Sequence, residues 1–491
     1  MTLSIPRLLF SLFIAATAIT FVFAYNGYPL FSIDSSCFVP AGYFIRHTHA
    51  LVNPFYDGGV STTPGNFLFY PPLFPCVIAL VSGMLPSHLN SLAATLTLLD
   101  TLTVAVLLLS LYRYIPKSRH RGTWITALFS AVWLTALFSF QGISPGRPEI
   151  LCKLFISLFI LNNLYPGSRK RNLFNGVLTG LTAITSPIST FYLLPMMWCV
   201  LLYREELTLR TVFETMAGAA FVFLLFAVFY PYKISELVTA MVAHSRNVIF
   251  HRYEESLLGG FKTNHLFTLN PLSVVSFFAA LVIALSALLR KKKYRVIFPL
   301  TLLVAVVCYF SFRSMPMSYN LYVLTPPVFF IIFVWYVNTG EGVRLTGRHG
   351  IAQWLLIVLL AVNATGFIRR VAVFAAARDR FVTASYFRDE FESLQRKIRQ
   401  GEKISITSGL WPYCLDRSDR VIIAYSGEQI PSDTAVRFLM VQQSYSGRLE
   451  PEVYPGFHII KDGFIRQNVR LAGLKISNTY PGYQIAIYER N

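Results

Sequence analysis

The chain has 491 residues, of which 54% are hydrophobic and only 14% charged, and its mean hydropathy is +0.52. These values exclude a soluble globular protein, because the repeated apolar runs have the length that a helix needs to cross a hydrocarbon layer of roughly 30 Å. The formal net charge of +19 does not indicate nucleic-acid binding. Much of this charge lies in short loops between apolar runs, where it reports membrane orientation.

Eleven apolar segments are predicted to be transmembrane helices. The first resembles a signal peptide, but we interpret it as an uncleaved helix because further apolar segments follow. The apolar run from Pro71 to Leu85 is short and begins with two prolines, so we predict a juxtamembrane or half-inserted helix there. The eleven helices are expected near residues 4–25, 88–112, 122–140, 149–165, 174–187, 189–203, 211–230, 271–289, 296–312, 320–338 and 351–368.

The loops between these helices differ in charge. With the N-terminus in the cytoplasm, the cytoplasmic loops hold 16 Lys and Arg residues, whereas the longer outer loops hold seven. This bias follows the positive-inside rule and predicts a multi-pass protein of the cell inner (plasma) membrane. It places four segments on the outer face, which are residues 26–87, 141–148 and 231–270 and the tail from about residue 369.

The composition changes at the start of this tail, where charges become dense. The segment "FRDEFESLQRKIRQ" has helical periodicity, and "KISIT", "RVIIAY", "RFLMV" and "YQIAIYER" have the features of short strands. We therefore predict a mainly α fold with two domains. Residues 1–368 form a polytopic transmembrane bundle, and residues 369–491 form a small extracytoplasmic α/β domain.

Polar residues gather on the predicted outer face. Asp34 follows the first helix in "IDSSCFVPAGYF", and Tyr70 precedes the double proline of "FLFYPPLFP". The segment "SPGRPEIL" places Arg147 and Glu149 at the start of the fourth helix. A carboxylate at the membrane boundary can mark the end of the helix, or it can be a reacting group held there.

These segments resemble the GT-C superfamily of polytopic glycosyltransferases over roughly residues 1–330. The resemblance includes the acid after the first helix, a loop helix with Tyr43, "NPFYDGG", "FYPPLFPCVIAL" and the outer-loop segment "GRPEILCKLF". The spacing from Asp34 to "YPPLF" is similar to that of the polyprenol-phosphate-mannose-dependent branch. "FRSMPMSYNLYVLTPP" contains Arg313 and Tyr319 and resembles the late Arg…Tyr…Pro motif of the protein mannosyltransferase and aminoarabinose transferase branches.

The resemblance implies an integral membrane glycosyltransferase. It would move a sugar from a polyprenyl-phosphate donor to a glycan, lipid or protein acceptor on the outer face, with Asp34 as general base and Glu149 as the second catalytic acid. Many members have Asp-Glu where this chain has Asp34 and Ser35, which leaves the branch open. Members also differ in metal use, so a divalent metal is neither required nor excluded, and no other cofactor is implied.

The outer loop of residues 231–270 is basic and amphipathic. It can lie on anionic lipid headgroups, or some of its side chains can bind the donor phosphate. Its three histidines lack the i, i+4 spacing of a helical metal-ligand pair, so no metal site is predicted. The predicted substrate-binding residues are Arg147, Tyr43, Tyr70, Arg246, Arg252, Lys262, His265, Arg313 and Tyr319.

Each central residue also has a simpler interpretation. Asp34 can mark the membrane boundary, Glu149 can favour the dipole at a helix start, and Arg147 can form a structural ion pair with either acid. Tyr70 can be an interfacial aromatic residue. Asp100 lies inside a predicted helix and is expected to form a buried hydrogen bond away from the outer-face chemistry.

Two other functions share this membrane topology. A transporter or flippase of a lipid-linked saccharide would require repeat symmetry and polar residues near the bilayer midplane, and only Asp100 supports it. A glycan ligase would be expected to depend on a large outer loop late in the chain, where residues 313–319 form a short one. Glycosyl transfer therefore remains the preferred interpretation.

Overall fold

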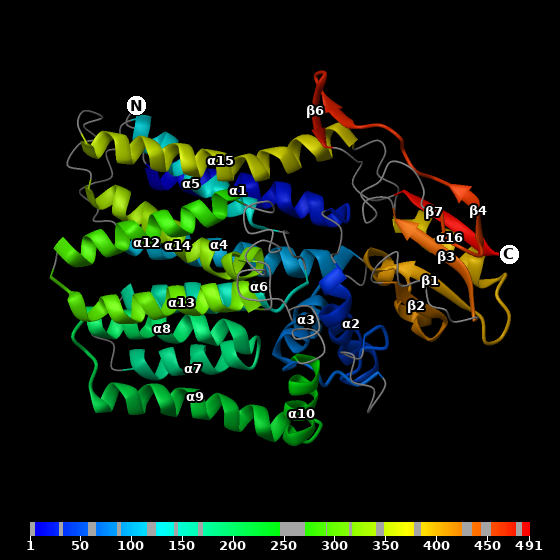
Figure 1. Cartoon of the computed structure of the whole chain (residues 1–491), viewed down its shortest axis with the longest axis horizontal. Coiled ribbons are helices and arrows are strands. Elements are labelled where there is room, and N and C mark those ends of the chain that lie inside the picture. The colour runs from blue at the N-terminus through cyan, green and yellow to red at the C-terminus, as the bar shows by residue number, and fades with distance from the viewer. Residues whose placement is uncertain are drawn as a thin grey trace.

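A bundle of long helices lies side by side, and a C-terminal domain stands at one end of it (Figure 1). The predicted fold class, a mainly α polytopic bundle with a small C-terminal α/β region, is confirmed. The computed structural model describes residues 5–28, 33–56, 65–85, 90–114, 124–141, 146–164, 170–245, 271–290, 292–313, 317–339, 348–377, 384–424, 435–442, 453–477 and 484–491.

Each predicted transmembrane segment corresponds to a helix. The last of them is longer than expected and continues past residue 368 to Ala377. The bundle helices are α1 (Ile5–Tyr25), α4 (Asn90–Tyr114), α5 (Trp124–Ser139), α6 (Glu149–Leu164), α7 (Arg171–Ala183), α8 (Pro187–Tyr203), α9 (Leu209–Phe229), α12 (Pro271–Arg290), α13 (Ile297–Arg313), α14 (Met317–Thr339) and α15 (Arg348–Ala377).

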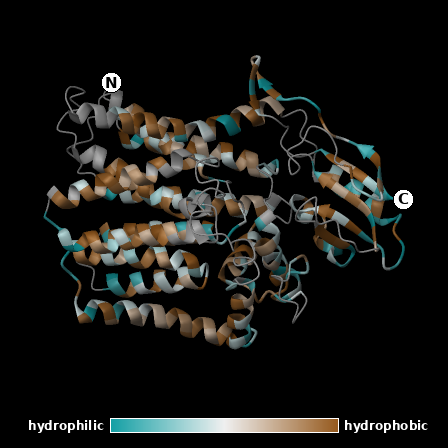
Figure 2. Ribbon diagram, viewed as in Figure 1, coloured by the Kyte–Doolittle hydropathy of each residue, from teal (hydrophilic) through white to brown (hydrophobic). Residues whose placement is uncertain are grey.

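The surface of the bundle is apolar enough to face lipid. Helices α1, α4, α9 and α15 contain spans with the length and hydropathy needed to cross a membrane, and several shorter helices are also apolar. On α9, Leu209 is 80% exposed and Phe229 is 79% exposed, which would be costly in water but is favourable in hydrocarbon. Hydrophobic residues extend along the bundle helices in Figure 2. The chain is therefore a multi-pass membrane protein.

Three shorter helices lie at the end of the bundle that faces the C-terminal domain (Figure 1). They are α2 (Ile33–Thr48), α3 (Leu73–Gly83) and α10 (Ile234–Ser245). With 11 residues, α3 is about 16 Å long, which is roughly half of the hydrocarbon thickness. It occupies the position predicted for the juxtamembrane helix. It packs closely on α2, where a Cβ atom on Gly42 would lie 2.7 Å from Cγ2 of Ile78.

The C-terminal domain contains α16 (Ala384–Gln395) and a mixed five-stranded sheet in the order β2-β1-β3-β7-β4. Strand β1 pairs in parallel with β2 and β3, and β7 pairs antiparallel with β3 and β4. Two 3-10 segments, η5 (Ser408–Tyr413) and η6 (Leu415–Arg420), follow β1. The strands are β1 (Lys403–Thr407), β2 (Val421–Ala424), β3 (Val436–Gln442), β4 (Phe457–Asp462), β7 (Ile485–Arg490) and the separate hairpin of β5 (Val469–Leu471) and β6 (Leu474–Ser477).

Helix α15 ties the bundle to this domain. The guanidinium of Arg370 donates to the carbonyl oxygens of Phe138 and Gln141 at the C-terminal end of α5. Its neighbour Arg369 donates through Nε to the carbonyl oxygen of Ile476 in β6 at 2.9 Å. A cation near the last carbonyl groups of a helix is also favoured by the helix dipole.

Helices α7 and α9 approach each other through glycines. A Cβ atom on Gly176 would lie 1.9 Å from the carbonyl oxygen of Thr215, so even alanine requires a backbone shift. Small residues allow such close packing in membranes, where no hydrophobic force draws helices together. We predict that Gly176→Ala destabilises the chain by about 1–3 kcal/mol, measured as a lower melting temperature in detergent. Gly83→Ala is the control, because its nearest neighbour would be 4.0 Å away, and equal melting temperatures would contradict the prediction.

Candidate functional site

Asp34, Arg147 and Glu149 meet at the end of the bundle that faces the C-terminal domain. Arg147 binds Glu149 through two hydrogen bonds, from Nε to Oε2 at 2.9 Å and from Nη2 to Oε1 at 3.2 Å. Its third nitrogen, Nη1, lies 3.0 Å from Oδ2 of Asp34. We call these three residues the triad. Two carboxylates share one guanidinium in it, so the triad carries a net negative charge when all three groups are ionised.

The local sequence explains how Arg147 reaches Asp34. Glu149 is the first residue of α6, and Asp34 lies in the first turn of α2. Gly146, three residues before Glu149, lies against α2. It has a φ of +90°, and a Cβ atom there would lie 2.5 Å from Cβ of Ser35. Glycine meets both demands, since it adopts positive φ without strain and has no side chain. Asn53 fixes the same turn of α2 by donating to the carbonyl oxygens at positions 36 and 37.

The two acids differ in accessibility. The side chains of Arg147 and Glu149 are 8% and 7% exposed, whereas that of Asp34 is 24% exposed. Paired hydrogen bonds between a guanidinium and a carboxylate are strong and directional, so Glu149 fixes the orientation of Arg147. Oδ1 of Asp34 accepts no hydrogen bond from the part of the chain that the structure describes. Asp34 is thus the carboxylate of the triad that a substrate hydroxyl can reach.

Tyr70 lies beside the triad and contacts the residue that precedes α8. Its hydroxyl is 2.9 Å from Oγ of Ser186, the residue before α8, and its ring packs edge-on against Phe38 with centroids 5.1 Å apart. Burial raises the pKa of Tyr70, and the negative charge of Glu149 raises this pKa further. The phenol therefore stays protonated and can donate a hydrogen bond.

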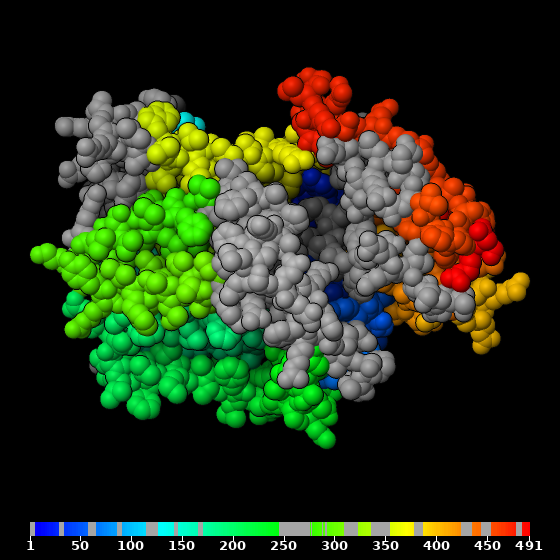
Figure 3. All heavy atoms as spheres, viewed as in Figure 1, coloured from blue at the N-terminus to red at the C-terminus, as the bar shows by residue number. Residues whose placement is uncertain are grey.

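The C-terminal domain reaches the triad through Trp411 in η5. Its indole Nε1 donates to Oγ of Ser35, the residue after Asp34, at 3.0 Å, and both residues are fully buried. Figure 3 shows blue N-terminal atoms between the bundle and the C-terminal domain. No local sequence pattern indicates the role of Trp411, because 376 positions separate it from Ser35.

Tyr43 does not join the triad. It lies nine residues beyond Asp34 on α2, and its hydroxyl donates to Oδ1 of Asp416 in η6 at 2.5 Å. Burial and this hydrogen bond raise the pKa of Tyr43 to about 12, so it remains a donor. Its ring stacks on His47 with centroids 4.0 Å apart.

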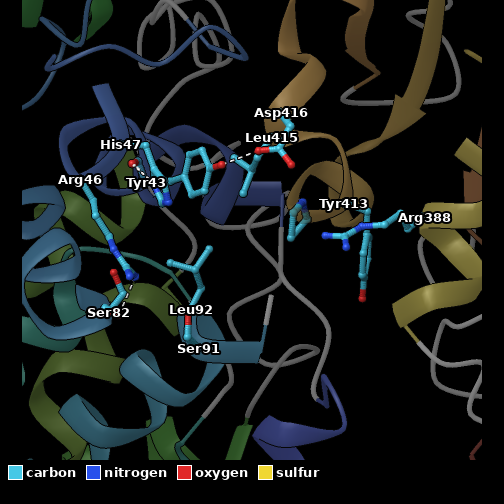
Figure 4. Close-up of a pocket in the computed structure, with 11 residues that line it drawn as sticks. Tyr43, Arg46, His47, Ser82, Ser91, Leu92, Arg388, Tyr413, Leu415 and Asp416 are labelled. Carbon is cyan, nitrogen blue, oxygen red and sulfur yellow. Dashed lines mark hydrogen bonds between the residues drawn. The ribbon is translucent and has the colours of Figure 1, made fainter. Parts of the chain in front are cut away.

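A pocket of about 130 Å³ opens next to Tyr43, where α2 meets the C-terminal domain (Figure 4). We call it the seam pocket. It is lined by residues from α2, α3, α4, α16 and the 3-10 segments η5 and η6. These residues are Tyr43, Arg46, His47, Ser82, Ser91, Leu92, Arg388, Pro412, Tyr413, Leu415 and Asp416.

Asp100 forms the buried hydrogen bond expected of it, but its partner is charged. Nζ of Lys153 in α6 donates to Oδ1 of Asp100 in α4, and the two residues are 2% and 4% exposed, respectively. Lys153 is one helical turn from Glu149 on the same helix, so the pair lies closer to the triad than predicted. A lysine inside an apolar helix is costly and usually paired, and this signal could have identified Lys153 from the sequence.

Several predicted substrate-binding residues are not described in full. Arg313 is the last residue of α13 and Tyr319 lies in the first turn of α14, but their side chains are not described. Within the described ranges, no group of three or more His, Cys, Asp and Glu side chains could hold a metal ion. The predicted residues outside the described ranges are Arg246, Arg252, Lys262 and His265.

Neither a protein-family model nor a curated protein matches the chain. Among solved structures, the crystal structure of ArnT from Cupriavidus metallidurans bound to undecaprenyl phosphate matches it with a TM-score of 0.51 and 11% identity, over 97% of both chains. ArnT is a GT-C glycosyltransferase. The chain has the GT-C fold. The apo structure of the same ArnT matches with a TM-score of 0.49 and 12% identity, over 97% of both chains.

The GT-C fold confirms, at the level of structure, the resemblance predicted from short motifs. The match covers 97% of this chain, so it includes the C-terminal domain, which the motifs of residues 1–330 did not cover. At this low identity the similarity establishes the fold alone.

Proposed function

We propose that the chain transfers a sugar from a polyprenyl-phosphate donor to an acceptor on the extracytoplasmic face, with Asp34 as general base. The triad carries this proposal, because it places a reachable carboxylate next to a fixed guanidinium at one end of a GT-C bundle. The ArnT structure with bound undecaprenyl phosphate supports a polyprenyl-phosphate donor. The acceptor is a glycan, a lipid or a protein hydroxyl.

The proposed reaction is a direct displacement. Asp34 takes the proton of the acceptor hydroxyl, and the acceptor oxygen forms a bond to the anomeric carbon of the donor sugar. The bond from that carbon to the phosphate oxygen breaks, and the polyprenyl phosphate leaves with the electron pair. General base catalysis typically contributes about 10²–10⁴-fold to such a step.

The remaining predicted site residues receive supporting roles. Glu149 is the second acid and holds Arg147, which binds the substrate beside Asp34. Tyr70 donates a hydrogen bond to the substrate near the triad. Tyr43 contacts the substrate at the seam pocket. We assign substrate binding to Arg246, Arg252, Lys262, His265, Arg313 and Tyr319. One or two of the four residues of the loop 231–270, together with Arg313, bind the donor phosphate.

The proposed orientation places the N-terminus in the cytoplasm of a cell with an inner (plasma) membrane and the C-terminal domain outside it. The excess of Lys and Arg in the cytoplasmic loops supports this orientation. We keep the proposed domains, a catalytic bundle of residues 1–368 and an extracytoplasmic domain of residues 369–491. A donor on this face is lipid-linked, since nucleotide sugars are cytoplasmic.

Membranes that contain the chain should move radiolabelled sugar from a polyprenyl-phosphate sugar to endogenous acceptors, and control membranes without it should not. A nucleotide sugar offered at the outer face should give no transfer. Movement of the labelled lipid across the bilayer without a new glycosidic bond would favour the transporter instead. Absence of transfer from every lipid-linked donor would refute the proposal.

We predict that Trp411 is a positioning residue for Asp34. Trp411→Phe keeps the aromatic ring but removes the N–H that holds Ser35, so kcat should fall about tenfold while KM for the donor stays constant. Small displacements of a catalytic group can cost as much as about 100-fold. Ser35→Ala should give the same loss, and the double variant should be no worse. Trp198→Phe in α8 is the control, and an equal loss there would contradict a specific role.

A further inference from the structure

The positive charge that lines the seam pocket is only partly neutralised by the carboxylate in the lining. Arg46 extends into it from α2 and Arg388 from α16, on opposite sides of the pocket (Figure 4). Arg388 makes no ion pair with any residue that the structure describes. Asp416 is the one carboxylate in the lining, and it already accepts a hydrogen bond from Tyr43 at 2.5 Å.

The rest of the lining offers hydrogen-bond donors and flat aromatic surfaces. The ring of Tyr43 stacks on His47, and that of Tyr413 stacks on Phe387 with centroids 5.0 Å apart. Arg46 donates through Nη1 to the carbonyl oxygen of Ser82 at 2.7 Å, which fixes its direction and leaves its other N–H groups for a ligand. Guanidinium groups match the geometry of phosphate and carboxylate oxygens.

We propose that the seam pocket binds an anionic polyol, a compound that carries hydroxyl groups and one phosphate. Arg46 and Arg388 bind the anion from opposite sides, and the tyrosine rings pack against the carbon skeleton of the polyol. A volume of about 130 Å³ is enough for the phosphate and the nearest carbon atoms, so the rest of the polyol extends out of the pocket. Both a phosphorylated sugar and the headgroup of an anionic glycerophospholipid have this chemistry. Bound there, the anion links α2, which carries Asp34, to the C-terminal domain.

The probe is glucose 1-phosphate, titrated by calorimetry into the full chain in phosphatidylcholine nanodiscs. We expect saturable binding, at least tenfold weaker binding of inorganic phosphate and no binding of glucose. Arg388→Gln should weaken binding of glucose 1-phosphate about tenfold, because it removes a charged hydrogen-bond donor. Arg46→Gln should also weaken binding of glucose 1-phosphate. The melting temperature of this variant shows whether loss of the contact with α3 destabilises the chain.

Arg396→Gln is the matched control, since Arg396 is an exposed residue just after α16 that does not line the pocket. Nanodiscs that contain phosphatidylglycerol distinguish the two candidate ligands, a phosphorylated sugar and the headgroup of an anionic lipid. Competition with glucose 1-phosphate identifies the site as a lipid headgroup site, and unchanged binding identifies it as a sugar-phosphate site. Absence of saturable binding, or an equal loss in Arg396→Gln and Arg388→Gln, would overturn the proposal. The readout is binding, so it is independent of whether the chain transfers sugar.

Discussion

Replacement of Asp34 by asparagine is expected to lower sugar transfer by about 10²–10⁴-fold, the usual contribution of a general base. The amide keeps the size of the side chain and an oxygen that can face Arg147 at the position of Oδ2, 3.0 Å away. It cannot accept the proton of a substrate hydroxyl. Transfer from a radiolabelled polyprenyl-phosphate sugar in membranes measures the loss, at equal yield of the solubilised protein.

The matched control is Asp389→Asn, which makes the same chemical change at an exposed position of α16 and should leave transfer unchanged. Glu149→Gln separates the two acids of the triad. It should also lower transfer, but through disorder of Arg147, so its melting temperature should fall as well. If Asp34→Asn transfers sugar at the wild-type rate, Asp34 only marks the membrane boundary, and Glu149 becomes the candidate base.

The bundle was predictable because the bilayer imposes a simple rule on the sequence. Spanning helices must be apolar, so their positions along the chain can be found from composition, although the last one extends beyond its predicted end at residue 368 to Ala377. The C-terminal sheet was predictable only in part. Strands β1 and β3 are buried and rich in β-branched or large apolar residues, whereas most side chains of β4 are exposed. A strand with few buried residues has no hydrophobic alternation to reveal it.

The members of the site were easier to predict than their contacts. Asp34, Arg147 and Glu149 each stood out as a charge at a predicted membrane boundary, but the sequence left open which acid Arg147 would pair with. The fold shows that it pairs with both. The contact of Trp411 with Ser35 depends on how a distant domain packs on α2, so no local pattern could indicate it.

The ion pair between Lys153 and Asp100 leads to the second large effect. Lys153→Met is expected to destabilise the chain by about 3–5 kcal/mol, because it leaves the Asp100 carboxylate buried without its counter-charge. The double variant Asp100→Asn, Lys153→Met removes both charges and should recover most of the lost stability. Melting temperature and monodisperse yield in detergent measure both variants. A double variant as unstable as Lys153→Met would contradict the prediction.

The double variant also tests how the pair relates to the triad. Lys153 is one turn from Glu149 on α6, so a shift of this helix would move Arg147 away from Asp34. A stable double variant with normal transfer would mean that the pair only joins α4 to α6. A stable double variant with reduced transfer would mean that the buried charges fix the depth of α6, and with it the reach of Arg147. The second outcome is expected, because a shift of about 1 Å at a catalytic group can cost about 100-fold in rate.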